Sequence, residues 1–590
     1  MKIRILLFVL FSLLIGFSFS TCIPTQRSLA LSAVVNDSAA QLIEVKISTI
    51  PGKGDVLISS TGSIGESTRY SLNTAADVAF RMLNKQRDCD IIFKIKTPVE
   101  SIDGPSGGAG FTILIASALE KKEIIKNFSI TGTIEENGMI GYVGKIPSKY
   151  EAFAKSGGKL MIVPVLEYYD KLSLLALKKY YKTDFYESSA IKDAYEIATG
   201  KNPTLNYSMP IEKELSFTYA QKAPLSFKKI SEKMLASANE KLKYVDKNLL
   251  EHFNSRIKNS ENALNTNNFY TSSNLLFLTL IDMDFSKFSL DRFETEKEEL
   301  EKCWESYESE LQKTGNGINN FEIVSSSEVR YAWSKLRSNA SLGKKIDRDN
   351  IANNLQDFYD IINSKYWCYA AIDFIQIANS SNGSVDSYVK DFAIAKYEEA
   401  KNHSNDEFQL RTSEYLINEG KYLASIFSSS MALSDWKASS MNASEEVNFT
   451  FIWPQLYYNH AVVYRDVYND SVTYRKLYAL AVDLENSLRE AKKLIEEKLI
   501  EEKINEMNVT NKTANVINVK NITNVEKKEE KEIVKERIAN IEEIRNRYIL
   551  ILIALVALIL AIYIAIIVRI KKKMKESKMV ETIRKPKGKK

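Results

Sequence analysis

Ser106 stands in the setting of this sequence that best suits nucleophilic chemistry. It lies in the segment 103–110, which reads DGPSGGAG and precedes an apolar stretch, Phe111 to Glu120, that predicts a helix. Glycines on both sides allow a tight turn and close approach of a ligand, and the amides at a helix start favour an anion such as an oxyanion. A glycine-rich turn that only caps the helix, or a nest that cradles a phosphate, would give the same pattern.

A lysine is the candidate base for this serine. The sequence has three histidines, and they are His252, His403 and His460. One compact N-terminal domain therefore holds no imidazole for a Ser-His-Asp triad. The segment 130–149 reads ITGTIEENGMIGYVGKIPSK and predicts a strand, a glycine-punctuated turn and a proline-started helix that carries Lys149. Lys149 follows Ser106 by 43 residues.

These two segments together resemble the proteolytic domain of the Lon proteases, where a serine in an Asp-Gly-Pro-Ser motif works with a lysine beyond a Thr-Gly strand. The spacing is similar to that of the family. The likeness begins upstream, at the segments 50–54 (IPGKG) and 61–67 (TGSIGES), and ends near Val163, with a weaker likeness to about Gly200. Several motifs at family spacing are more specific than any one of them. The chain also resembles archaeal membrane-anchored Lon-related predicted serine proteases.

The resemblance implies a Ser-Lys site with Ser106 as nucleophile and Lys149 as general base. That role requires burial to lower the lysine's pKa by several units from about 10.4. Thr131 would hold the lysine amine by a hydrogen bond, and Asp103 would point away from it. The amides of Ser106 and Gly107 would donate to the oxyanion. A Lys149 at the surface in an ordinary ion pair is the alternative, and its pKa would stay high.

Two departures from the family pattern lie close to these residues. Gly107 stands where Lon usually has alanine. Residues 144–149, which read GKIPSK, replace the family's Gly-Gly-Leu-Lys-Glu-Lys, so the setting of Lys149 is less well fixed by the resemblance than that of Ser106.

The sequence shows no motif for nucleotide binding, metal binding or nucleic-acid binding. No Gly-x-x-x-x-Gly-Lys-Ser/Thr phosphate loop occurs, so the ATPase module that accompanies Lon proteases is missing. Cysteine and histidine spacings do not resemble a metal site, and no basic, aromatic-interleaved face argues for nucleic acid. We therefore expect no cofactor and no metal, with protein or peptide substrates as partners. Lon domains form hexameric rings in the family, which makes a homo-oligomer an open expectation.

The two ends of the sequence predict a single-pass membrane protein. Residues 1–20 combine Lys2 and Arg4 with an apolar run and small residues, which is typical of a signal peptide, although an uncleaved anchor would look similar. Residues 548–568 carry no charge and are long enough to span a bilayer. The basic tail 569–590 follows at once, so the positive-inside rule places it in the cytoplasm and residues 21–547 outside.

Sequons and cysteines bear on the same location. Thirteen Asn-X-Ser/Thr sequons fit an exported surface that carries glycans, and an Asn-rich composition also produces some by chance. The four cysteines form no disulfide framework. One bridge, Cys303 to Cys368, could form, and free buried thiols are an equal alternative.

The pattern of elements predicts an α+β proteolytic domain followed by a mostly α-helical domain, a helical stalk and one C-terminal transmembrane helix. The expected segments are a lead-in (21–41), the Lon-like domain (42–200), a linker (201–224), the helical domain (225–507), and a linker with stalk (508–547). Within the Lon-like domain, the strands expected over 42–50 and 55–60 are predicted to pair as a hairpin. Helices are expected over 66–84, 168–181 and 189–199.

Glycine is concentrated before residue 200, and between Pro224 and Pro586 the only proline is Pro454, so the later region is expected to be helical. Its clearest predicted helices are 226–245, 291–313, 327–336, 386–401 and 474–507. The segments 264–270 and 416–422 resemble helix-turn-helix elbows, and the aromatic stripes are interpreted as core. Two functions follow: an extracytoplasmic, ATP-independent serine endopeptidase, or a surface receptor or scaffold whose Lon-like domain is inactive.

Overall fold

The computed structural model describes residues 22–36, 39–97, 100–217, 224–381, 383–441 and 448–518. The chain divides into two compact units, residues 1–498 and 499–590. The predicted signal peptide (1–20), membrane helix (548–568) and basic tail lie outside the described residues, as does the stalk beyond residue 518. Within the described part, no helix is long and apolar enough to cross a membrane.

The N-terminal region begins with a four-stranded sheet in the order β1-β2-β5-β3. Its strands are β1 (Thr25–Asn36), β2 (Ala39–Pro51), β3 (Val56–Ser60) and β5 (Cys89–Ile95). β5 lies between β2 and β3, antiparallel to β2 and parallel to β3. The predicted hairpin is therefore wrong: both strands exist, but they are not paired. A parallel β3–β5 pair needs a crossover, which α2 (Glu66–Met82) supplies.

β1 and the first residues of β2 lie within the segment 21–41, for which the sequence predicts only a lead-in. It pairs antiparallel with β2, from Thr25 opposite Thr49 to Asn36 opposite Ala39. Leu29 and Leu31 point into the core and are 5% and 6% exposed. These two leucines are two positions apart and therefore lie on the same face of the strand. This alternation is the pattern by which the sequence indicates a strand here. β1 is thus part of the domain, a correction to the expected boundary at residue 42.

The rest of the N-terminal region alternates short strands with helices. Its further elements are β4 (Ser63–Ile64), β6 (Ser101–Ile102), η1 (Pro105–Gly107), α3 (Gly108–Glu120), β7 (Phe128–Ile130), β8 (Thr133–Ile134), β9 (Ile140–Gly141), α4 (Ile146–Lys155), β10 (Leu160–Val163), α5 (Tyr168–Tyr181), β11 (Asp184–Glu187) and α6 (Ile191–Ala198). A second, parallel sheet has the order β11-β10-β7. The expected α+β class and the expected helices are confirmed, whereas β11 was not predicted.

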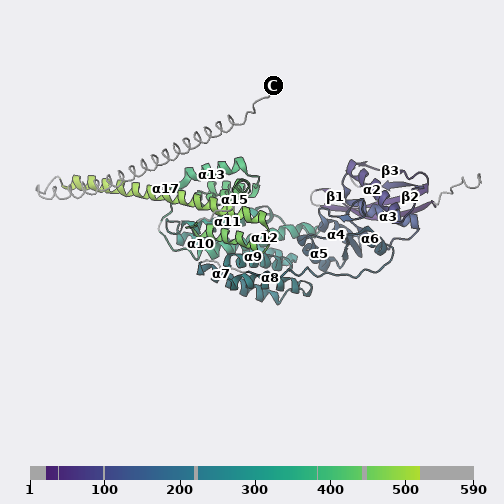
Figure 1. The fold of residues 1–590 in the computed structure, drawn as a ribbon, viewed down its shortest axis with the longest axis horizontal. Coiled ribbons are helices and arrows are strands. Elements are labelled where there is room, and N and C mark those ends of the chain that lie inside the picture. The colour runs from purple at the N-terminus through teal and green to yellow at the C-terminus, as the bar shows by residue number, and fades with distance from the viewer. Residues whose placement is uncertain are drawn as a thin grey trace, which may run out of the picture. The chain divides into compact units, whose positions relative to one another are not determined.

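Beyond residues 201–217, which form neither helix nor strand, the described chain is mostly helical (Figure 1). Its helices are α7 (Leu225–Leu242), α8 (Lys247–Asn265), α9 (Phe269–Phe285), α10 (Leu290–Thr314), α11 (Phe321–Leu342), α12 (Ile351–Ile375), η2 (Asp386–Val389), α13 (Lys390–His403), α14 (Glu407–Asn418), α15 (Tyr422–Ser440), α16 (Ile452–Asp466) and α17 (Ser471–Asn518). All five helices expected here are present, but α17 continues to Asn518, so residues 508–518, which were expected to form a linker, are helical. The two predicted elbows join α8 to α9 and α14 to α15.

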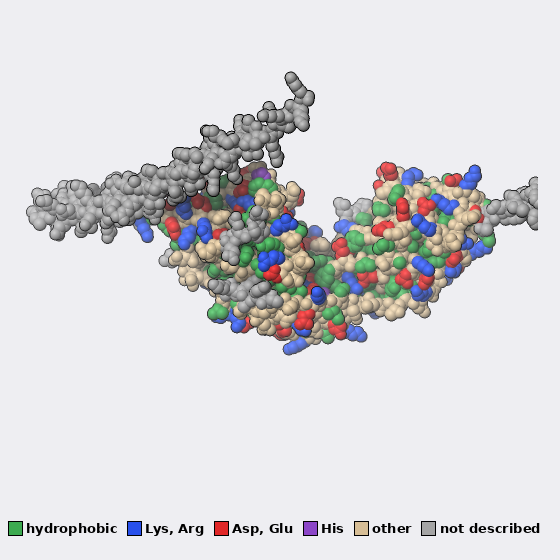
Figure 2. Space-filling model, viewed as in Figure 1, with side chains coloured by type: hydrophobic (Ala, Val, Ile, Leu, Met, Phe, Trp, Pro, Cys, Tyr) green, Lys and Arg blue, Asp and Glu red, His purple; other side chains and the backbone are tan. Residues whose placement is uncertain are grey.

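All four cysteines are paired in disulfides, Cys22 with Cys89 and Cys303 with Cys368. The second bridge is one of the two alternatives left open by the sequence, and free thiols are excluded. The first was missed because Cys22 falls at the predicted signal boundary, while the strand that brings it beside β5 was not recognised. On the face visible in Figure 2, basic and acidic side chains are interspersed.

Candidate active site

Ser106 lies at the turn that leads from β6 into α3. Gly104 has φ +139°, a conformation that L side chains rarely adopt, and a Cβ there would meet nothing within 4 Å. Glycine is therefore required at position 104 because of the backbone conformation, and not because a larger side chain would collide with its neighbours. Pro105 then starts η1, and α3 follows directly, so Ser106 sits at a helix start and is only partly buried. The amides of such a first turn lack intrahelical acceptors and favour an anion.

Phe111 explains the unusual glycine beside Ser106. A Cβ on Gly107 would lie 2.7 Å from the ring of Phe111. That ring is held in the core by an edge-on contact with Phe93, with centroids 5.6 Å apart. The alanine that Lon usually has at this position would therefore collide with Phe111, so glycine and phenylalanine fit as a pair.

The two residues between β7 and β8, Thr131 and Gly132, anchor the backbone of Ser106. The carbonyl of Ser106 accepts a hydrogen bond from the Gly132 amide at 3.0 Å, and the Ala109 amide donates to the Gly132 carbonyl at 3.2 Å. The Thr131 hydroxyl donates to the same Ser106 carbonyl at 3.5 Å. The structure thus brings Thr131 next to Ser106. It does not show the predicted hydrogen bond from Thr131 to the amine of Lys149.

Lys149 is buried on α4, and its side chain is only 3% exposed. Burial alone lowers its pKa to about 8, and no neighbouring charge contributes. None of the ion pairs between described residues involves this lysine. A surface Lys149 in an ordinary ion pair, the alternative left by the sequence, does not match this placement. The nearby Val143 and Ile146 are buried, whereas Tyr142 is 45% exposed and donates to Asp170.

β1 brings the two candidate elements onto one scaffold. It packs against both η1, which carries Ser106, and α4, which carries Lys149. The Ser32 hydroxyl on β1 donates to the carbonyl of Lys149 at 2.9 Å, which fixes the turn of α4 that bears the lysine. The hydrogen bonds of the described residues do not include one between the Ser106 hydroxyl and the Lys149 amine. Such bonds are often long or absent in a protease without substrate.

Asp103 is engaged elsewhere. Its carboxylate accepts hydrogen bonds from the Ser67 hydroxyl, from the Thr68 amide at 3.1 Å and from the Gly104 amide at 2.9 Å. These bonds, that from Ser67 first, lower the pKa of Asp103. The Asp103 carboxylate therefore accepts hydrogen bonds from the first turn of α2 and does not form an ion pair with Lys149.

Glu151 is a residue near the site that sequence reasoning missed. It follows Lys149 by two positions on α4 and is 2% exposed. Its carboxylate accepts hydrogen bonds from the amides of Ile351 and Ala352, at 2.7 and 2.8 Å, and so caps the N-terminus of α12. Lys155 forms an ion pair with it at 3.0 Å. No local pattern could reveal this, because the partner amides lie 200 residues away.

Comparison with known families now adds to this geometry. Residues 29–186 match the model of the Lon protease (S16) C-terminal proteolytic domain. Residues 29–186 are a Lon-type proteolytic domain. The Lon protease of Mesomycoplasma hyopneumoniae is 30% identical over 131 residues, which are 21% of this chain and 14% of that protein. Lon protease 2 of Bacillus subtilis is 27% identical over 168 residues, which are 25% of this chain and 30% of that protein.

The Lon protease of Mycoplasma mycoides is 31% identical over 130 residues, covering 21% of this chain and 16% of that protein. The chain thus spans less than a third of the length of each of these relatives. The Lon-type domain begins within β1 and ends within β11, and it contains Ser106, Thr131 and Lys149. The helical region lies outside the match.

Proposed function

We propose that this protein is a membrane-anchored, extracytoplasmic serine endopeptidase that works without ATP and uses Ser106 and Lys149 as a dyad. The observation that carries the proposal is the burial of Lys149 without an acidic partner, which lowers its pKa to about 8. A lysine with such a pKa is neutral in a sizeable fraction of molecules near neutral pH and can accept a proton. The Lon-type domain around it supports peptide hydrolysis as the reaction.

The chemistry of the dyad follows from these positions. The neutral Lys149 amine removes the proton from the Ser106 hydroxyl as its oxygen attacks the scissile carbonyl carbon. Amides of the first turn around Ser106 and Gly107 stabilise the resulting oxyanion, each contributing about 3 kcal/mol. The Lys149 ammonium then returns the proton to the leaving amine. Water, deprotonated by the same lysine, hydrolyses the acyl-enzyme and regenerates Ser106.

The decisive measurement is peptide cleavage by the full chain in detergent or nanodiscs. Ser106→Ala and Lys149→Arg should each lower kcat/KM by at least about 10³-fold, because arginine stays protonated at neutral pH. Ser148→Ala and Lys159→Arg, which change a serine and a lysine outside the proposed dyad, serve as matched controls and should leave cleavage unchanged. For the unmodified protein, kcat/KM should rise with pH through about 8, as Lys149 loses its proton. Addition of ATP and magnesium should have no effect.

The outcomes of this assay separate the hypotheses. Activity in Lys149→Arg equal to that of the unmodified chain would eliminate Lys149 as base. No cleavage by the unmodified chain, together with no labelling of Ser106 by a fluorophosphonate probe, would favour the inactive receptor or scaffold.

The proposed location rests on the sequence of the two ends and is supported by the disulfides. Disulfides persist in oxidising compartments and are rare in the cytosol, and both bridges of this chain lie in the part assigned to the outside. A protease added to intact cells or spheroplasts should degrade residues 21–547 and leave a small fragment with the basic tail. Protection of the whole chain would contradict this topology.

A further inference from the structure

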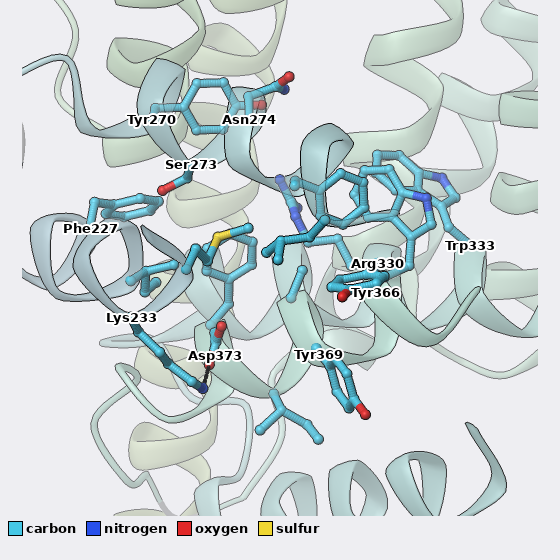
Figure 3. A pocket seen from close by; sticks show the side chains of 18 of the residues that line it. Phe227, Lys233, Tyr270, Ser273, Asn274, Arg330, Trp333, Tyr366, Tyr369 and Asp373 are labelled. Carbon is cyan, nitrogen blue, oxygen red and sulfur yellow. Dashed lines mark hydrogen bonds and ion pairs between the residues drawn. The ribbon is translucent and has the colours of Figure 1, made fainter. Parts of the chain in front are cut away.

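A cavity lies in the helical region, separate from the residues of the proposed dyad. It has a volume of about 500 Å³, which falls in the range of small-molecule and peptide sites. Helices α7, α9, α11, α12, α15, α16 and α17 contribute its wall, and none of the lining residues belongs to the Lon-type domain. Figure 3 shows the side chains that converge there.

Most of this wall is aromatic or aliphatic. The main apolar contributors are Phe227, Met234, Phe277, Trp367, Phe374 and Leu480. Such a wall favours an apolar or aromatic body over a fully polar ligand, since burying apolar surface is favourable and burying unpaired polar groups is not. The wall alone does not define a ligand, so its few polar groups decide the chemistry.

Arg330 is the charged group that lines the cavity without a carboxylate partner. Its side chain is 3% exposed, and the ion pairs of the described residues include none with it. The guanidinium donates to the Ser326 carbonyl at 2.7 Å, forms a hydrogen bond with the Tyr457 side chain, and lies over rings, with Trp453 at 4.0 Å and Phe374 at 4.6 Å. In Figure 3 the Arg330 side chain extends toward the centre of the group. Cation–π contacts offset only part of the cost of burying a charge.

Trp333 gives an independent sign of a missing acceptor. It lines the cavity, is 7% exposed, and its Nε1 has no hydrogen-bond partner among the described residues. A buried N–H without an acceptor loses its hydrogen bond to water and gains none in the folded chain, so an acceptor supplied by a ligand would be favourable. The arginine and the indole N–H lie one turn apart on α11, so both donors come from the same face of one helix.

The balance of charge in the cavity also favours an anion. Its only other charged lining residues, Lys233 and Asp373, are paired at 2.5 Å and lie together at one side (Figure 3). Their charges cancel, which leaves the single positive charge of Arg330. Asn274 and Ser273 add polar groups nearby. The site therefore offers donors and one net positive charge inside an apolar wall.

We propose that this cavity binds a carboxylate attached to an apolar or aromatic body, with the carboxylate on Arg330 and the Trp333 N–H as its second donor. Two sources share this chemistry: the C-terminus of a polypeptide that ends in apolar residues, and a free apolar acid. Arginine suits a carboxylate because its planar fork of N–H groups matches the two oxygens. The site would give the helical region a binding function of its own, whether or not the Lon-type domain cleaves peptides.

The test is a binding measurement on the full chain carrying Ser106→Ala in nanodiscs, so that no probe is cleaved. The probes are N-acetyl-Phe-Leu-Phe with a free carboxylate, the same peptide as its amide, and 4-phenylbutyrate as a free acid. Titration calorimetry should show that the peptide acid binds at least tenfold more tightly than the amide. Comparable affinity for 4-phenylbutyrate would identify free acids as ligands, and binding of the peptide acid alone would identify polypeptide C-termini.

Variants locate the binding in the cavity. Arg330→Met should remove the preference for the acid, whereas Arg337→Met on the same helix, whose guanidinium lies over Phe408 at 4.4 Å and does not line the cavity, should keep it. Trp333→Phe keeps the ring, removes the N–H and should weaken the acid severalfold, which provides a second variant if Arg330→Met does not fold. Equal binding of acid and amide, or an acid preference that survives both cavity variants, would overturn the proposal.

Discussion

The Lon-type domain and the helical region differ in whether their buried lysines and arginines have a carboxylate nearby. Among the described residues, the buried lysines and arginines are Lys149, Arg256, Lys297, Arg330, Lys365 and Lys396. Four of the five in the helical region have a carboxylate within 4 Å: Asp282, Glu294, Glu296 and Asp483 are the partners. Among the described residues of the Lon-type domain, Lys149 is the one buried lysine or arginine, and it has no such partner.

The two exceptions, Lys149 and Arg330, mark the two proposed sites, and the difference between them is chemical. A lysine relieves the cost of burial by releasing its proton, which leaves a neutral amine that can act as a base. An arginine stays charged at any physiological pH, so it needs an external anion or aromatic faces. A buried lysine without a carboxylate partner is therefore suited to act as a base, whereas Arg330 keeps its charge over aromatic rings and is suited to bind an anion.

The largest expected effect comes from breaking one of the pairs. Asp282→Asn would remove the buried carboxylate 2.5 Å from Arg256 and leave this arginine with only the more exposed Glu212, at 3.5 Å. Loss of one member of a buried pair costs about 3–5 kcal/mol. Urea unfolding of the full chain should show this loss. The matched control is Asp435→Asn, since Asp435 forms an exposed pair with Lys476 and its loss should cost less than about 1 kcal/mol. Equal effects of the two substitutions would show that burial does not distinguish the pairs.

The next effect concerns Lys149 and has a defined pH dependence. Its pKa is lowered to about 8 in the folded chain, against about 10.4 when unfolded, so the unfolded state binds more protons between these values. The free energy of unfolding therefore rises with pH across this window. The difference between the unmodified chain and Lys149→Met should grow in favour of lysine by about 2–3 kcal/mol from pH 7 to pH 10. Lys159→Met, at an exposed lysine, should show no such trend. A flat difference for Lys149→Met would mean that the amine stays charged.

Short sequence patterns were sufficient to predict many of the helices and strands of the Lon-type domain. The glycine-rich DGPS segment before a predicted helix made Ser106 a candidate nucleophile, and the resemblance to Lon implied Lys149, on the proline-started helix, as its base. The order of the strands in the sheet could not be predicted from such patterns. The pairing of β3 with β5 in place of β2 depends on the crossover through α2, which no short window contains.

Long-range contacts account for the features that the sequence did not yield. The capping of α12 by Glu151 joins residues 200 positions apart, and the Cys22–Cys89 bridge depends on β1 beside the sheet. The aromatic stripes were interpreted as core, and Trp453 is indeed fully buried. The cavity, the lack of a carboxylate beside Arg330 and the unpaired N–H of Trp333 could not be foreseen, since an alternating pattern shows which face is buried but not whether the interior is filled.

The smallest expected effect concerns the residue that starts the helix carrying Lys149. Lys145 has φ +60° and ψ +35°, in the left-handed region, where Lon usually has glycine. A side chain there costs roughly 1–2 kcal/mol, and the greater freedom of glycine in the unfolded chain offsets part of the gain. Lys145→Gly should therefore raise the free energy of unfolding by up to about 1 kcal/mol.

A second left-handed lysine provides the control for this substitution. Lys182 has φ +56° and ends α5, the helix that follows the one carrying Lys149. Lys182→Gly should stabilise the chain to the same extent, because the gain comes from backbone conformation in both cases. A loss of stability in Lys145→Gly, with a gain in Lys182→Gly, would show that the Lys145 side chain makes contacts that hold α4 in place. The replacement of the family's glycine would then be part of how this chain positions its buried, unpaired lysine.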